Sequence, residues 1–143
     1  MAREPRSGKF FLLNRILETG SLGGLCIGDD DQRLQTILGP PPVSPSRLGR
    51  RSTLWAWSYG NVTLLTVEHR IVDIQLNFEC RPFRPVQPGP LARWLLSTWQ
   101  ARATREGWQV DVRDDVIVLH SAHARIFMDL TGELHTVTLL RTR

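Results

Sequence analysis

The sequence predicts an α+β fold in which helices pack on one face of an antiparallel β-sheet. Residues 71–78 alternate apolar and polar side chains, which is typical of a strand with one buried face and one wet face. Residues 91–106 instead repeat apolar side chains at helical spacing. Two-residue turn signals between the strands indicate neighbours joined by tight hairpins. These patterns predict a tandem helix plus antiparallel β-meander.

A first helix is predicted over residues 9–19. Its apolar side chains recur at helical spacing and comprise Phe10, Phe11, Leu12, Leu13, Ile16 and Leu17. Gly20 follows at a usual stop position, so the helix is expected to end there.

A second helix is predicted to begin at a run of three aspartates. Asp29 is expected to be the N-cap, with Gln32 completing a capping box. Asp30 and Asp31 then lie in the first turn, where unsatisfied N–H groups favour negative charge. The start of a helix therefore explains the aspartates without a metal or catalytic role.

Gly39 and the three prolines after it end this helix and open a loop over residues 40–52. The loop holds four prolines and three arginines, Arg47, Arg50 and Arg51. This composition predicts a mobile, basic connection with polyproline character.

Three strands are predicted next, over residues 53–59, 62–68 and 71–78, with turns at Gly60–Asn61 and His69–Arg70. On the last strand, Val72, Ile74, Leu76 and Phe78 are expected to face one way, and Ile71, Asp73, Gln75 and Asn77 the other. These three strands form the first predicted meander, and a proline-rich connector follows it.

Pro90 begins the strongest predicted helix, which runs to Gly107 and has Leu91, Trp94, Leu95 and Trp99 on its apolar face. A second meander follows over residues 108–113, 116–120, 124–129 and 133–141, with turns at Asp114–Asp115 and Thr131–Gly132. Residues 62–76 can be laid over 124–139 with matching alternation and a turn at the same place. We therefore expect a single domain, 1–143, with an internal repeat of 9–79 and 89–141.

The alternating aromatic residues of the first strand allow two interpretations. Trp55, Trp57 and Tyr59 point to one side of the strand. They either fill the core between the sheet and the helices, or form a partner-facing patch, with Leu54 and Ala56 then facing the helices.

Two patterns carry a resemblance to known families: the Gly-x9-Leu-Gly-Pro-Pro string of Gly28–Pro41 and the aromatic strand Trp55-Ala-Trp57-Ser-Tyr59-Gly60. With them, residues 20–79 resemble small bacterial domains of the SmpA/OmlA type and the repeats of beta-lactamase inhibitor proteins. The resemblance implies short helices on an antiparallel sheet and a habit of binding proteins. The sequence departs from these families because it has neither a lipoprotein signal nor evident disulfides.

Chemical motifs are sparse. His120, His123 and His135 could form a zinc site with Asp129, but H-x-x-H alone is a weak pattern, and strand histidines are the preferred interpretation. Cys26 and Cys80 are expected to be reduced thiols, since no apolar run is long enough for a secretory signal or a membrane span. We expect no cofactor, no catalysis and a cytoplasmic location away from membranes.

The net charge is +4, but 17 of the 18 cationic residues are arginine, which weakens the argument for a phosphate-binding protein. The sequence predicts a non-catalytic protein-binding module. The most specific form of this prediction is an immunity or inhibitor-like protein of a bacterial toxin system. The expected partner is an acidic protein that contacts Trp55, Trp57, Tyr59, Arg47, Arg50 and Arg51. The alternatives are a basic nucleic-acid-binding protein and, less favoured, a small metal-dependent enzyme.

Overall fold

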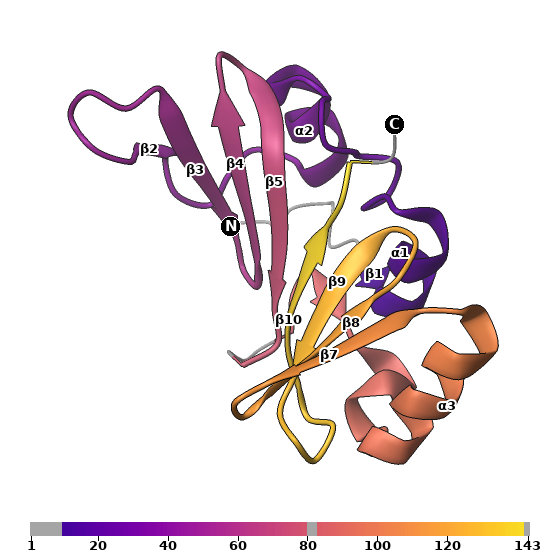
Figure 1. Ribbon diagram of the computed structural model, residues 1–143. Helices are drawn as coiled ribbons and strands as arrows, with labels where there is room; N and C mark the ends of the chain where they lie inside the picture. The colour runs from indigo at the N-terminus through magenta and orange to yellow at the C-terminus, as the bar shows by residue number, and fades with distance from the viewer. Residues whose placement is uncertain (1–9, 80–82, 142–143) are drawn as a thin grey trace.

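A computed structural model describes residues 10–79 and 83–141 and confirms the α+β class (Figure 1). Eight strands form one antiparallel sheet in the order β2-β3-β4-β5-β10-β9-β8-β7, and β1 pairs in parallel with β6. The strands are β1 (Phe11–Leu12), β2 (Ser46–Arg47), β3 (Leu54–Tyr59), β4 (Val62–Val67), β5 (Arg70–Asn77), β6 (Val86–Gln87), β7 (Gln109–Arg113), β8 (Val116–His120), β9 (Ala124–Met128) and β10 (Leu134–Leu139). The helices are α1 (Leu13–Thr19), α2 (Asp31–Leu38), the 3-10 helix η1 (Gly89–Arg93) and α3 (Leu96–Glu106).

The strand order is symmetric about the pair β5–β10. Each half contributes a meander of four strands, β2 to β5 and β7 to β10, and the last strand of one meander pairs with the last strand of the other. Strands β4 and β9, which begin the two overlaid segments, occupy equivalent places in this order. The internal repeat stays a prediction, and the symmetric order is what such a repeat requires.

The core lies between one face of the sheet and the helices. That face supplies one buried residue after another across the sheet, including Leu64, Ile74, Val137, Ile126 and Leu119. The helices supply Leu13 and Ile16 from α1, Leu34 from α2 and Trp99 from α3. The opposite face carries half-buried polar side chains along its centre, among them Thr63, Gln75, Thr136 and Thr138.

The first helix is shorter than predicted. Phe11 and Leu12 form β1 instead, and the Phe11 N–H donates to the carbonyl oxygen of Pro85 at 2.9 Å. Helix α1 therefore starts at Leu13, without a side-chain cap, and ends as predicted at Gly20.

Helix α2 is capped by Asp30 rather than Asp29, so the predicted capping box with Gln32 is wrong. The Asp30 carboxylate accepts a hydrogen bond from the Arg33 N–H at 2.9 Å. Asp29 instead accepts from the Cys26 N–H at 2.8 Å, and Asp31 meets His69 Nδ1 at 2.7 Å. All three aspartates thus have structural partners.

The predicted helix over 91–106 is two helices. Trp94 and Leu95 have extended backbones, which separate η1 from α3 and turn Leu95 outward. The first N–H of α3, on Leu96, donates to the Thr131 carbonyl at 3.0 Å. The turn between β9 and β10 therefore decides where α3 begins.

A register shift changes the faces of β5. Leu65 pairs with Asp73 and Thr66 with Ile71, so Val72 is an extra residue in the ladder. Ile71 is consequently buried and Val72 exposed, the reverse of the predicted assignment. The turn before β5 is Glu68–His69, one residue earlier than predicted, and both residues have positive φ.

Two of the other predicted turns lie where expected, whereas the turn predicted at Thr131–Gly132 is centred one residue earlier, at Leu130–Thr131, within a longer connection. Tyr59 pairs with Val62 across Gly60–Asn61, and Arg113 with Val116 across Asp114–Asp115. Among the described residues, no helix has the length and apolar character needed to cross a membrane.

The longer connection from β9 to β10 is organised by Asp129. Its Oδ1 accepts hydrogen bonds from the Thr131 hydroxyl at 2.6 Å, the Thr131 N–H at 2.8 Å and the Glu133 N–H at 3.0 Å. The Thr131 hydroxyl contributes most to lowering the pKa of this carboxyl.

Candidate functional site

The hairpin formed by β2 and β3 gathers four of the six residues predicted to bind a partner. Arg47 lies directly opposite Trp55 in the ladder, and Arg50 and Arg51 lie in the turn. Figure 1 shows β2 and β3 at one edge of the sheet. The turn is held by its own backbone, because the Leu48 N–H donates to the Leu54 carbonyl at 2.9 Å. We call residues 46–55 the basic hairpin.

The three arginines of the basic hairpin are exposed and have no acidic partner within the described residues. Their charges are therefore available to a ligand from solution. The hairpin lies at the edge of the sheet, where the ladder ends with β2. The basic hairpin therefore presents three positive charges on a backbone held by hydrogen bonds between β2 and β3.

The aromatic residues of β3 divide into one exposed and two buried side chains. Trp55 has 41% of its surface exposed, whereas Trp57 has 8% and Tyr59 has 5%. The Trp57 indole N–H donates to the Thr66 hydroxyl at 3.1 Å, and the Tyr59 hydroxyl donates to the Gly39 carbonyl at 2.8 Å. The core interpretation is therefore correct for Trp57 and Tyr59, and only Trp55 can act as a surface anchor.

The predicted orientation of the strand's other face is corrected accordingly. Trp57 and Tyr59 face the helices, so Leu54 and Ala56, which alternate with them, face the open side of the sheet. Alternation alone groups residues on one side of a strand but does not say which side the helices cover.

Within the basic hairpin, sequence reasoning missed the exposed apolar residue Leu48. It lies in the turn of the basic hairpin beside Arg47 and is exposed like Trp55. A signal was present, since Leu48 lies between Arg47 and Gly49 in a proline- and arginine-rich loop and has no adjacent apolar side chain in sequence. Leu48 and Trp55 together add an apolar component to the basic surface.

Burial raises the pKa of Tyr59 to about 12. Tyr59 is the single tyrosine of the chain, so tyrosinate absorbance during alkaline titration reports on it alone. We expect the midpoint of this titration near pH 12 in the native protein and near pH 10 in urea. The pKa of Tyr59 is higher in the folded protein than in the unfolded chain. The contribution of Tyr59 to the free energy of unfolding is therefore complete below the unfolded pKa and is lost as the pH rises towards 12.

The Tyr59→Phe variant is the control for this titration. It lacks the ionisable group, so its free energy of unfolding should depend less on pH above about 10. A native midpoint near the unfolded value would contradict the burial of the Tyr59 hydroxyl.

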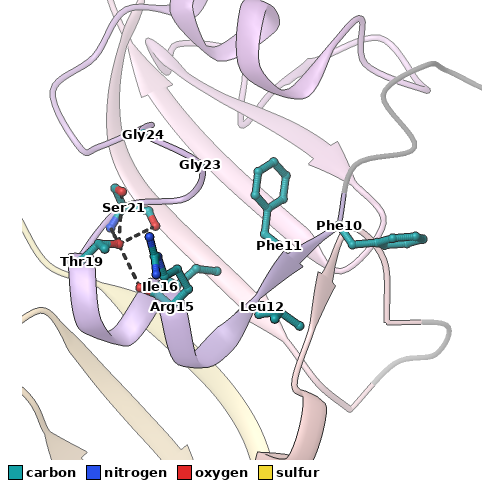
Figure 2. Close-up of a pocket in the computed structure, with 9 residues that line it drawn as sticks. All are labelled: Phe10, Phe11, Leu12, Arg15, Ile16, Thr19, Ser21, Gly23 and Gly24. Atoms are coloured by element: carbon teal, nitrogen blue, oxygen red, sulfur yellow. Dashed lines mark hydrogen bonds between the residues drawn. The ribbon is translucent and has the colours of Figure 1, made fainter.

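A recess of about 550 Å³ lies between β1, α1 and the loop that follows α1 (Figure 2). The Phe11 ring points toward Gly23, and Arg15 and Ile16 line the side formed by α1. The Thr19 hydroxyl lies 3.3 Å from the Ser21 hydroxyl and donates to the Arg15 carbonyl at 3.0 Å. These hydroxyls lie at the end of α1. The described residues that line the recess include neither a histidine nor a carboxylate.

The histidines of the proposed zinc site have separate surroundings. His120 Nε2 lies 2.8 Å from an Asp111 oxygen, His135 Nδ1 lies 3.5 Å from a Glu79 oxygen, and the ring of His123 packs on Gly20. Across residues 10–79 and 83–141, no group of three or more His, Cys, Asp or Glu side chains could hold a metal ion.

Cys26 is a free thiol, and burial together with the nearby Asp29 carboxylate raises its pKa. A raised pKa disfavours the thiolate, the reactive form of cysteine. Cys80 lies outside the described residues.

Comparisons with known proteins add no relative: no family model, curated protein or solved structure matches this chain. The resemblance to SmpA/OmlA domains and to beta-lactamase inhibitor proteins therefore stays a prediction.

Proposed function

We propose that this chain is a non-catalytic protein-binding module that contacts an acidic partner through the basic hairpin. The observation that carries the proposal is the set of three arginines, without acidic partners in the described chain, beside the exposed Trp55 and Leu48. Arginine and tryptophan are enriched among residues that dominate binding energy at interfaces. An immunity or inhibitor-like protein of a bacterial toxin system, acting in the cytoplasm, is the specific form of this proposal.

The test begins with capture of the partner from a lysate of the native organism, with and without nuclease. We expect one protein to be retained at near-stoichiometric level in both samples. Capture that disappears with nuclease would favour the alternative, a nucleic-acid-binding protein that uses arginines and Trp55. That alternative also predicts a steep loss of affinity with salt.

The triple variant Arg47→Glu, Arg50→Glu, Arg51→Glu should then slow association with the captured partner. We expect the association rate at low salt to fall by at least ~10-fold, because these charges steer the encounter. The matched control is Arg93→Glu, Arg113→Glu, Arg125→Glu, which makes the same change in net charge at exposed positions elsewhere. Equal rates for the two triple variants would remove the basic hairpin from the mechanism.

A further inference from the structure

A second site lies at the junction of α1, η1 and α3, away from the basic hairpin. It is a pocket of about 340 Å³, a volume suited to a small molecule. Its walls include Asn14 and Glu18 from α1, Leu91 from η1, Trp94 from the link between η1 and α3, and Arg102 and Arg105 from α3.

The unusual feature of this pocket is the burial of Arg102. Only 6% of its surface is exposed, although a buried guanidinium requires acceptors for its five N–H groups. Its central carbon lies 5.7 Å from the ring centre of Trp94 and 5.0 Å from that of Trp108, within the range of cation–π attraction. The indoles stabilise the charge but accept none of its in-plane hydrogen bonds.

One side-chain acceptor is present. The Arg102 Nε–H donates to a Glu106 oxygen at 2.8 Å. The two terminal nitrogens have no acceptor among the described residues, and Arg102 lines the pocket. These nitrogens are not among the buried unpartnered atoms of the described residues, so they keep accessible surface, and an acceptor can reach them from the pocket that Arg102 lines.

The charges around the pocket differ between its two sides. On α3, two arginines, Arg102 and Arg105, face one glutamate, Glu106, so this side carries a net charge of +1. An Arg105 nitrogen lies 3.9 Å from a Glu106 oxygen. On α1, Glu18 has no cationic partner among the described residues, and Asn14 lies beside it on the lining. Leu91, in η1, and Trp94, just after η1, supply apolar surface.

From this layout we propose that the pocket binds a small zwitterion of the α-amino-acid class with an apolar side chain. Its carboxylate accepts hydrogen bonds from the terminal nitrogens of Arg102, a pairing suited to the planar guanidinium. Its ammonium group lies toward Glu18, and its side chain lies against Leu91 and Trp94. This site is separate from the basic hairpin, so the two proposals can fail independently.

L-leucine is the probe for the test, with two analogues that each remove one charge. Binding is followed in nuclear magnetic resonance spectra through the indole N–H signals of Trp94 and Trp108 and the Nε–H signal of Arg102. We expect leucine to shift these signals with a dissociation constant on the order of 1 mM, since the ligand is small. N-acetylleucine, which lacks the ammonium, and leucinamide, which lacks the carboxylate, should each bind at least ~10-fold more weakly.

Two variants identify the charged partners, one at the exposed Glu18 and one at the buried Arg102. Glu18→Gln should make leucine bind as weakly as N-acetylleucine, whereas Glu68→Gln, at the turn before β5, should leave leucine binding unchanged. Arg102→Lys keeps a positive charge but removes the planar pair of donors, and it should abolish the preference for leucine over leucinamide. Circular dichroism establishes that each variant is folded.

Two results would overturn the proposal. One is the absence of any shift at about 50 mM leucine, far above the expected dissociation constant. The other is equal binding of leucine and leucinamide by the unmodified chain, which would exclude a role for the carboxylate.

Discussion

Replacing Asn61 with aspartate should lower the free energy of unfolding by about 3 kcal/mol at pH 7. Asn61 has 4% of its surface exposed, and its side chain bonds both peptide groups of Val86. Its Nδ2 donates to the Val86 carbonyl at 2.8 Å, and its Oδ1 accepts from the Val86 N–H at 3.1 Å. An ionised carboxylate cannot donate, and it would place a negative oxygen against that carbonyl.

Urea denaturation followed by tryptophan fluorescence measures the effect. The difference between Asn61→Asp and the original chain should narrow as the pH falls, because a protonated carboxyl regains a donor for the Val86 carbonyl. Asn14→Asp makes the same chemical change at an exposed position and should cost no more than about 0.5 kcal/mol. Equal losses for the two variants would contradict the described role of Asn61.

The second large effect is expected for Gly132→Ala. Gly132 has φ +96°, and a Cβ added there would overlap the backbone of Leu95 and Leu96, where α3 begins. Backbone cannot move aside as a flexible side chain can, so we expect a loss of about 3 kcal/mol in the free energy of unfolding.

Gly107→Ala is the matched control for this substitution. Gly107 ends α3 with φ +73°, but a Cβ added there would meet nothing within 4 Å. It should therefore cost only the conformational penalty, about 1 kcal/mol. Denaturant midpoints that fall equally in the two variants would show that the contact between the β9–β10 turn and α3 adds nothing to backbone strain.

Local patterns predicted much of the fold because they depend on neighbours in sequence. The turns at Gly60–Asn61 and Asp114–Asp115 and the helix end at Gly20 follow from the residues that form them. The break between η1 and α3 could not be predicted in this way. It depends on the Thr131 carbonyl, which is distant in sequence from Leu96 and becomes adjacent only in the folded chain.

The difference between local patterns and contacts of distant residues also explains which features of the candidate site could be predicted. Proline and arginine composition predicted an exposed basic segment, and Arg47, Arg50 and Arg51 are indeed on the surface. The burial of Trp57 and Tyr59 depends on which face of the sheet the helices cover. The Arg102 pocket was not predicted either, because it combines α1, η1 and α3 and only the spacing of Arg102 and Glu106 is visible in sequence.

The position of β10 has a consequence for the order of events during synthesis. This strand lies between β5 and β9, and in the described sheet it is the strand that joins the second meander to the first by hydrogen bonds. While a ribosome is still making residues 134–139, the finished first meander presents the unpaired edge of β5 to its surroundings. Completion of the domain must therefore wait for β10 to emerge, and until then the nascent chain carries an edge to which another unfinished chain can add.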